Sequence, residues 1–525
     1  MSYINRETEG CSRPDSCTTA YSGRSALKYG TTMTRSLLIF LLFSIVIGAS
    51  TWMTPIEFDS AFNFQVASSL LEKFSYESRY IPVKIYHEQI TTNGPIQYYM
   101  ALFIGLFGLD LGRALGLGIL GGMAAFSIYK YSRHSFILYC LLLLFWPLFA
   151  ELHNLFLGEI LTITMIIVGL SQWEKWHDWL ESHFSHHSFS NNSIWHNYRL
   201  WATGLAFGAA IATKLIAIGI IPLLLFCLSF HAMGNYHDKT KIEQSNLFAY
   251  WFIVPMLIAL AFFMLQFSIS IMHSSGNPGS IMPSLKLFIV EHLHQANTAK
   301  FKLNLQDSYL QFNGTIIILL LVSLCLLLYK NIAFSIPAIF IMVLLFIVHL
   351  NLRRTLPLIV PLLLLSIKII AASQPGIAAH YTVRGLVVLL FSGLTLISGC
   401  LLTHTPLYLI DRLRQFSLAG APHNVALITK DQSTYDESLI TIIKDLDGPV
   451  FTTRWWQFPE ISLRAGAIFY DRRAPETSRI LYEKPCYLLF SAHNPPDKSS
   501  ENSLCGTILY KDGDLVLCEY RPNVL

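Results

Sequence analysis

The feature that most constrains this chain is a series of apolar runs, many of which approach the length that crosses a lipid bilayer. A membrane-spanning helix needs about 20 mainly apolar residues. The chain has 525 residues, of which 53% are hydrophobic and 13% charged, whereas a soluble protein carries about 25% charged residues. Backbone groups in lipid must form hydrogen bonds within their own segment, so the runs should be helices. The sequence therefore predicts a polytopic α-helical membrane protein.

The apolar runs also set the expected order along the chain. There are about eleven by the ~20-residue criterion, or twelve to thirteen if the longest is two helices. They fall at residues 36–51, 96–108, 112–129, 136–150, 155–170, 200–230, 247–271, 315–329, 332–350, 356–372 and 385–402.

The segments between and before these runs suggest the topology. Residues 1–34 are polar and predict a disordered cytoplasmic tail ahead of a membrane domain over 35–402. Arg24, Lys28 and Arg35 flank the first run and favour a cytoplasmic N-terminus, which places the loop at 53–95 outside. Polar insertions at 173–198 and 272–313 interrupt the later runs. An odd number of spans would put the C-terminus outside as well.

From residue 403 onward the composition indicates a soluble domain, which we expect to be extracytoplasmic. Thr434 and Glu437 have the spacing of a helix capping box, and a predicted helix ends at Gly466. Asp512-Gly513 is a typical hairpin turn between two strands. Alternating helices and strands predict a small α/β domain. This domain has three cysteines, which allow at most one disulfide, and the sequence does not select the pair from Cys486, Cys505 and Cys518.

The first loop carries the most informative pattern. Its apolar residues Phe58, Phe62, Val66 and Leu70 recur every four positions and predict a helix lying on the bilayer surface. Asp59 and Asn63 share that spacing on an adjacent face. With Glu57, Asp59 would form an acidic pair at the mouth of the helix bundle. The alternative is a solvated loop with ordinary acidic residues.

The sequence FDSAFNFQVASSLLEKF, followed by NGPIQYYMALFIGLFG, resembles the first extracytoplasmic loop of the GT-C membrane glycosyltransferases. The nearest resemblance is to the protein O-mannosyltransferase and aminoarabinose transferase branch. It implies that an acid at this place is catalytic, with Asp59 favoured and Glu57 as the alternative. We expect Asn63, which shares a helix face with Asp59, to contact substrate. The resembled family often has an acid at the position of Glu159, which could hydrogen-bond a sugar hydroxyl or the first loop. Because forming the glycosidic bond releases a proton from the acceptor, a carboxylate base suits this reaction.

Three basic residues are candidates for binding a phosphate. If the C-terminal domain is outside, Arg353 and Arg354 also lie outside, against the usual bias of basic residues toward the cytoplasm. Guanidinium groups bind phosphate bidentately. The alternative is that the count of spans is off by one and these arginines are cytoplasmic anchors. Lys214 interrupts an apolar run. A charged lysine is energetically costly inside a membrane, so Lys214 is a candidate for a functional site. It could mark a break between two helices facing a donor phosphate, or extend to the membrane surface. For Glu159, the alternative to a contact with substrate or the first loop is a position at the membrane interface.

The resemblance implies a donor sugar linked to polyprenyl phosphate, transferred with inversion to a lipid, glycan or protein acceptor, at the bacterial inner membrane. The sequence predicts neither a metal nor another cofactor, because its histidines lack a ligand spacing and no nucleotide-binding motif occurs. The net charge of +4 is too small to suggest a nucleic-acid partner. The rival function is a transporter or flippase for a lipid-linked glycan, which would not need an extracytoplasmic acid. The histidines that lack a ligand spacing are those of the polar insertion at 173–198, namely His177, His183, His186, His187 and His196.

Overall fold

The computed structural model describes residues 17–54, 56, 58–74, 94–145, 147–184, 195–233, 241–275, 281–283, 285–286, 352–372, 437–452, 458–467, 469–471, 485–491, 504–513 and 515–521. The predicted spans at 315–329, 332–350 and 385–402 lie outside these residues.

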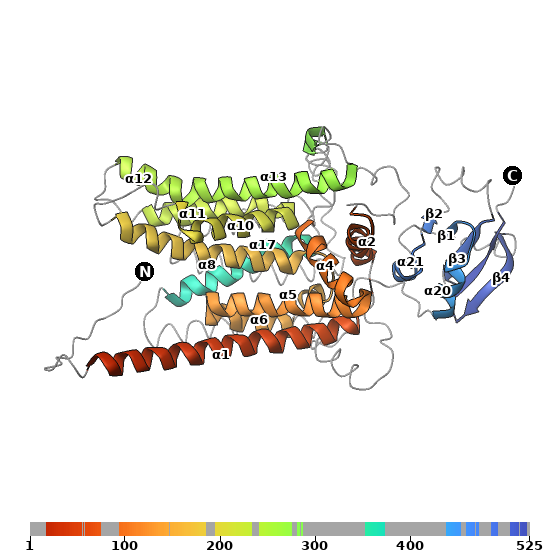
Figure 1. Ribbon diagram of the computed structural model, residues 1–525, viewed down its shortest axis with the longest axis horizontal. Helices are drawn as coiled ribbons and strands as arrows, with labels where there is room; N and C mark the ends of the chain where they lie inside the picture. Colours follow the sequence, from red (N-terminus) through yellow and green to blue (C-terminus); the bar gives the residue numbers. More distant parts are fainter. Residues whose placement is uncertain are drawn as a thin grey trace, which may run out of the picture.

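Long helices packed side by side form the body of the protein (Figure 1). Three segments of the described chain are long and apolar enough to cross a membrane, namely Met33–Trp52, Leu109–Tyr131 and Gln244–His273. Shorter apolar helices complete the bundle around one continuous core. The helices are α1 (Cys17–Trp52), α4 (Gly94–Phe107), α5 (Leu109–Tyr131), α6 (Arg133–Phe145), α7 (Pro147–Leu152), α8 (Glu159–Phe184), α10 (Tyr198–Thr213), α11 (Ile221–Met233), α12 (Lys241–Phe248), α13 (Val254–Ser275) and α17 (Leu352–Ala372).

Two helices extend into stretches where we expected none. Helix α1 begins at Cys17, inside the predicted disordered tail. Residues 15–34 contain no proline, so the helix of the apolar span can extend toward the N-terminus as far as Cys17. Helix α8 continues to Phe184, through the first part of the predicted polar insertion. The sequence gives the reason, because Trp173, Trp176 and Leu180 have helical spacing and are all buried in the core.

The longest apolar run is broken into two helices at Lys214, as one of our alternatives predicted. Helix α10 ends at Thr213, Lys214 is extended with a φ of −139°, and a 3₁₀ turn, η1 (Leu215–Gly219), leads into α11. A backbone that leaves the helical conformation inside a membrane domain must be buried in protein or line a cavity. This break is therefore the irregular point around which a site can form.

Small residues bring α1 and α5 into close contact. A Cβ at Gly118 would lie 2.5 Å from the backbone oxygen of Ser44, and one at Gly122 would lie 2.6 Å from that of Phe40. A Cβ at Gly48 would in turn lie 3.1 Å from the backbone oxygen of Ala114. Small residues at such interfaces allow helix backbones to approach closely in a membrane, where dispersion contacts replace the hydrophobic effect.

The C-terminal domain has a five-stranded sheet in the order β2-β1-β3-β5-β4. Strand β1 pairs in parallel with β2 and β3, whereas β5 pairs in antiparallel fashion with β3 and β4. The expected helix from Glu437, the helix ending at Gly466 and the final hairpin are present, whereas Thr434 of the predicted capping box lies outside the described residues. The elements are α20 (Glu437–Lys444), β1 (Val450–Thr452), α21 (Pro459–Ala465), β2 (Phe469–Asp471), β3 (Tyr487–Ser491), β4 (Cys505–Asp512) and β5 (Leu515–Tyr520).

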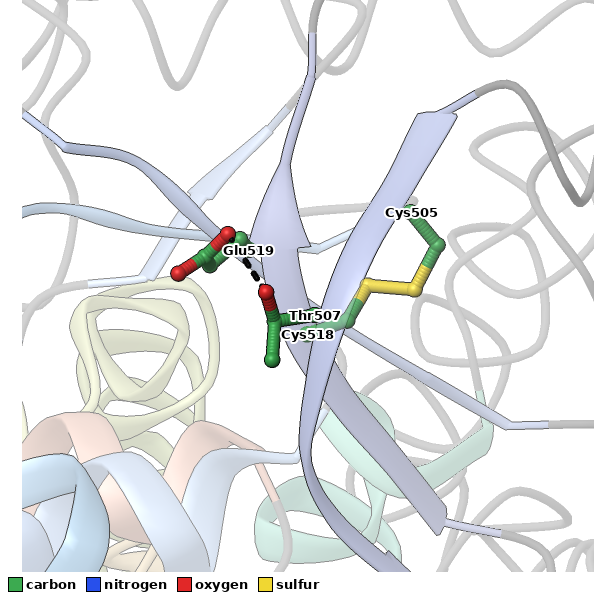
Figure 2. Close-up of a disulfide and its surroundings, with 4 residues drawn as sticks. All are labelled: Cys505, Thr507, Cys518 and Glu519. Atoms are coloured by element: carbon green, nitrogen blue, oxygen red, sulfur yellow. Dashed lines mark hydrogen bonds between the residues drawn. A yellow bond between two sulfur atoms is a disulfide. The ribbon is translucent and has the colours of Figure 1, made fainter.

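The structure selects the cysteine pair that the sequence left open. Cys505 and Cys518 form a disulfide across the final hairpin (Figure 2). Cys486 is buried and takes no part in this disulfide. Beside the disulfide, the Thr507 hydroxyl donates a hydrogen bond to Glu519 across the same two strands. The pairing follows from the antiparallel register, which brings the ends of β4 and β5 together.

We expect Gly118→Val to destabilise the bundle by more than the ~1–3 kcal/mol usual for overpacking, because its side chain would meet the α1 backbone rather than a movable side chain. The midpoint of thermal unfolding in detergent measures this. Gly219→Ala is the control, since a Cβ there meets no atom within 4 Å. Equal losses in the two variants would contradict the close α1–α5 packing.

Candidate functional site

Helix α2 (Phe58–Lys73) lies across one end of the helix bundle, between the bundle and the C-terminal domain (Figure 1). We call this end the α2 end. The predicted helix in the first loop is thus confirmed. Its buried positions include Asn63, Val66, Ala67 and Leu70, so its packed face is wider than the predicted apolar stripe. α2 packs against α4 on the bundle and against α21 of the C-terminal domain.

Hydrogen bonds from α2 hold the connection between α7 and α8. Asn63 donates through Nδ2 to the backbone oxygen of Phe156 at 2.8 Å, and the Ser60 hydroxyl accepts from the Phe156 N–H at 3.0 Å. Gln97 of α4 donates to Asn63 Oδ1 at 2.7 Å. All these groups are buried. Asn63 therefore fixes α2 onto the bundle, a role that we did not predict for it; substrate contact stays a prediction.

The same connection is tied to the end of α1. Thr51 donates to Asn154 Oδ1 at 3.2 Å, and Asn154 Nδ2 donates to the Ser50 hydroxyl at 2.9 Å. The connection ends at Gly158, which has a φ of +92°, a conformation that favours glycine. A Cβ at Gly158 would lie 2.8 Å from the Thr213 side chain. Glycine here thus allows the start of α8 to meet the end of α10.

An ion pair occupies this meeting point. Lys214 Nζ lies 3.2 Å from Glu159 Oε1, and the two side chains are 19% and 1% exposed. Glu159 is the first residue of α8, and Lys214 is the residue at which α10 stops. A buried carboxylate needs a compensating partner, because removing one member of a buried pair leaves an uncompensated charge. The structure thus brings together two candidates that the sequence offered separately.

Helix α17 is oriented so that Arg353 and Arg354 lie toward the α2 end. Farther along α17, Ser135 of α6 donates to the Leu364 carbonyl, and Lys368 pairs with Glu174 in the middle of α8. These contacts are toward the end of the bundle away from α2. The first turn of α17 therefore points to the α2 end, where η1 packs against this helix. The side chains of Arg353 and Arg354 lie outside the described residues.

The predicted acids are placed only in part. Asp59 is the second residue of α2, so its backbone is at the α2 end, but its side chain lies outside the described residues. Glu57 lies outside them altogether. The residue before α2 that is described, Ile56, is buried and donates its N–H to Glu460 of the C-terminal domain at 3.2 Å.

Several polar residues of this end escaped sequence analysis. Arg113, buried in α5, donates to the Thr54 carbonyl at 2.8 Å and so fixes the start of the first loop. Arg464 of α21 binds both Asp110 of α5 and Glu460. A charged residue in an apolar run could have marked Arg113, but nothing local in the sequence links Asp110 to Arg464 across 354 positions.

One group of possible metal ligands lies within the described residues. His177, Asp178 and Glu181 come close enough together to be considered. Asp178 and Glu181 are exposed on α8, and an acidic surface cluster of this kind is common without an ion. The side chains of the neighbouring His183, His186 and His187 lie outside the described residues.

Comparison with known proteins identifies the fold. No protein-family model matches the chain, and no curated protein matches it in sequence. The crystal structure of ArnT from Cupriavidus metallidurans bound to undecaprenyl phosphate matches with a TM-score of 0.53 and 13% identity, over 92% of this chain and 97% of that chain. An Archaeoglobus fulgidus oligosaccharyltransferase, crystallised with a tethered acceptor peptide, matches with a TM-score of 0.49 and 10% identity, over 87% of this chain and 69% of that chain. The second similarity is too low to support an argument.

The chain is therefore a polytopic α-helical membrane protein with a small C-terminal α/β domain, as its sequence predicted. Its architecture is the GT-C fold that it shares with ArnT, and the match extends over nearly the whole of both chains. At 13% identity this similarity establishes the fold and leaves the activity to be argued from the site.

We expect Asn63→Ala to lower stability by about 1–3 kcal/mol, because it leaves the buried Phe156 carbonyl and the Gln97 amide without these bonds. The midpoint of thermal unfolding in detergent reports the loss. Ser68→Ala, on the same helix at a half-buried position, is the matched control and should change the midpoint little. If Asn63→Ala unfolds at the wild-type temperature, the bonds do not hold α2.

Proposed function

We propose that the protein is an integral membrane glycosyltransferase that moves a sugar from a polyprenyl-phosphate-linked donor to an extracytoplasmic acceptor. The observation that carries this proposal is the buried Glu159–Lys214 pair at the helix break beside the α2 end. It occurs in a fold shared with ArnT, whose crystal structure contains undecaprenyl phosphate. A cation held at an interrupted helix inside a membrane domain suits an anionic lipid headgroup.

The donor phosphate would bind at Lys214. An ammonium group has three N–H donors, so Lys214 can donate to phosphate oxygens while it stays paired with Glu159. Glu159 would then orient the ammonium group and compensate its charge when no donor is bound. Arg353 and Arg354 begin α17 at the same end, where the positive end of the helix dipole also favours an anion. Together these cations would stabilise the phosphate as it leaves with the negative charge.

The acceptor would be activated by an acid of the first loop. Asp59, or Glu57 beside it, would take the proton from the acceptor hydroxyl as its oxygen attacks the anomeric carbon. The bond between that carbon and the phosphate oxygen breaks in the same displacement, and the configuration inverts. The lipid phosphate leaves with the electron pair of the broken bond. A carboxylate at the membrane surface suits the role of base, because low polarity increases its affinity for a proton.

Two features support an extracytoplasmic α2 end. Basic residues gather at the other end of the bundle, including Arg35, Lys130, Arg133, Lys175 and Arg199, and such residues favour the cytoplasmic side. The disulfide in the C-terminal domain suits an oxidising compartment. The C-terminal domain, over residues 403–525, would then lie outside a bacterial inner membrane, with the N-terminal tail in the cytoplasm.

We expect Asp59→Asn to abolish transfer while leaving the protein folded and inserted, because the amide cannot accept the acceptor proton. The measurement is turnover of a polyprenyl-phosphate-linked sugar by the purified enzyme in detergent or nanodiscs. Glu57→Gln is the matched control and should keep most of the activity. Loss of activity only in Glu57→Gln would move the role of base to Glu57. Activity in both variants would exclude this mechanism, as would transport of an unchanged lipid-linked glycan by the wild-type protein.

We expect Lys214→Met to raise the KM for the donor about 10- to 100-fold, the range that corresponds to one charge-assisted hydrogen bond. Lys368→Met is the matched control, since Lys368 is also a lysine of the helix bundle paired with a glutamate, but away from the α2 end. It should lower thermal stability and leave the donor KM unchanged. An equal donor KM in both variants would remove Lys214 from the donor site.

A further inference from the structure

The C-terminal domain is joined to the segment in front of α2 by a charged network. We call it the domain latch and define it as Ile56, Asp110, Glu460 and Arg464. The Ile56 N–H donates to Glu460 Oε2 at 3.2 Å. Arg464 donates to Glu460 Oε1 through Nε at 3.0 Å and Nη2 at 2.9 Å. Its Nη1 and Nη2 also donate to Asp110, at 2.9 and 2.7 Å.

The latch reaches the segment that precedes the proposed catalytic acid. Ile56 is 1% exposed and stands two residues before α2 and three before Asp59. Because it precedes the helix, its N–H has no place in the α2 hydrogen-bond ladder. Glu460, which is 404 positions away in the chain, accepts it instead. The carboxylate of Glu460 thus lies at the positive end of the α2 dipole, which favours a negative charge.

Arg464 makes the position of Glu460 well defined. The two residues are four apart on α21, so the guanidinium group can hold the carboxylate along the helix face. The same guanidinium forms a bidentate pair with Asp110 in the first turn of α5. Bidentate geometry fixes direction as well as distance. Both side chains of the Glu460–Arg464 pair are largely buried, at 13% and 21% exposed, so solvent screens them less than a surface pair.

We infer that Glu460 is a positioning residue, with Arg464, for the acid-bearing start of α2, and that transfer depends on the C-terminal domain for this reason. This inference rests on the proposed function. The C-terminal domain would act by holding the backbone from which Asp59 projects, without touching the substrate. A displacement of about 1 Å in a catalytic group can lower a rate about 100-fold.

The variants Glu460→Ala and Glu460→Gln separate positioning from general stability. Alanine removes the acceptor of the Ile56 N–H, whereas the glutamine carbonyl can still accept it. We expect Glu460→Ala to lower kcat at least about tenfold with little change in the donor KM. Glu460→Gln should remain near the wild-type kcat. Lys444→Ala, at an exposed lysine of α20 in the same domain, is the control and should match the wild type.

Hydrogen exchange supplies a measurement that does not need transferase activity. In nanodiscs, Glu460→Ala should exchange the Ile56 amide about 10- to 100-fold faster, the loss expected for one hydrogen bond to a charged group. Glu460→Gln and Lys444→Ala should not. Asp110→Asn serves as a second variant if Glu460→Ala fails to fold. It removes the charge that binds Arg464 from the membrane domain, so it should also increase the exchange rate of the Ile56 amide and lower kcat.

Unchanged exchange in both Glu460→Ala and Asp110→Asn would overturn the latch. Faster exchange with an unchanged kcat would overturn the positioning role and leave the proposed function standing. If the wild-type protein shows no transfer while exchange still responds to Glu460→Ala, the latch holds and the proposed function fails, and the positioning role fails with it.

Discussion

The architecture of the α2 end depends on one constraint, that a charge removed from water must meet a partner. Glu159 is almost fully buried at the start of α8, and Lys214 reaches it because α10 stops one residue earlier. A continuous helix through Lys214 would carry an unpaired ammonium group in an apolar bundle. Gly158 permits the approach, since any side chain there would collide with Thr213. The break in the helix therefore occurs at the residue that pairs with the buried carboxylate.

Around this pair, polar contacts replace the apolar packing of the rest of the bundle. α2 is held through Asn63 and Ser60 to both backbone groups of Phe156, and Asn154 ties the same connection to α1. Buried hydrogen bonds of this kind are costly when incomplete, so they define one arrangement rather than several. An end of the bundle with fixed backbone geometry suits a reaction in which donor, acceptor and base must be aligned.

The C-terminal domain extends this polar framework beyond the bundle. Its Glu460 contacts Ile56 of the first loop, just before α2, and its Arg464 contacts the first turn of α5. Arg113 fixes the same loop from within the membrane domain. The start of the first loop is thus held by the membrane domain at Thr54 and by the C-terminal domain at Ile56.

The sequence by itself determined the membrane class, the helix of the first loop and several local elements of the C-terminal domain, and it offered the helix break at Lys214 as one of two alternatives. These follow from apolar run length, periodicity and turn residues, which act over short distances along the chain. It could not determine that Glu159 pairs with Lys214, that Cys505 rather than Cys486 bonds to Cys518, or that Arg464 meets Asp110. Nor did it show that Asn63 holds α2 to the bundle. These contacts join residues up to hundreds of positions apart, and only packing in three dimensions decides which charges and thiols come within reach of each other.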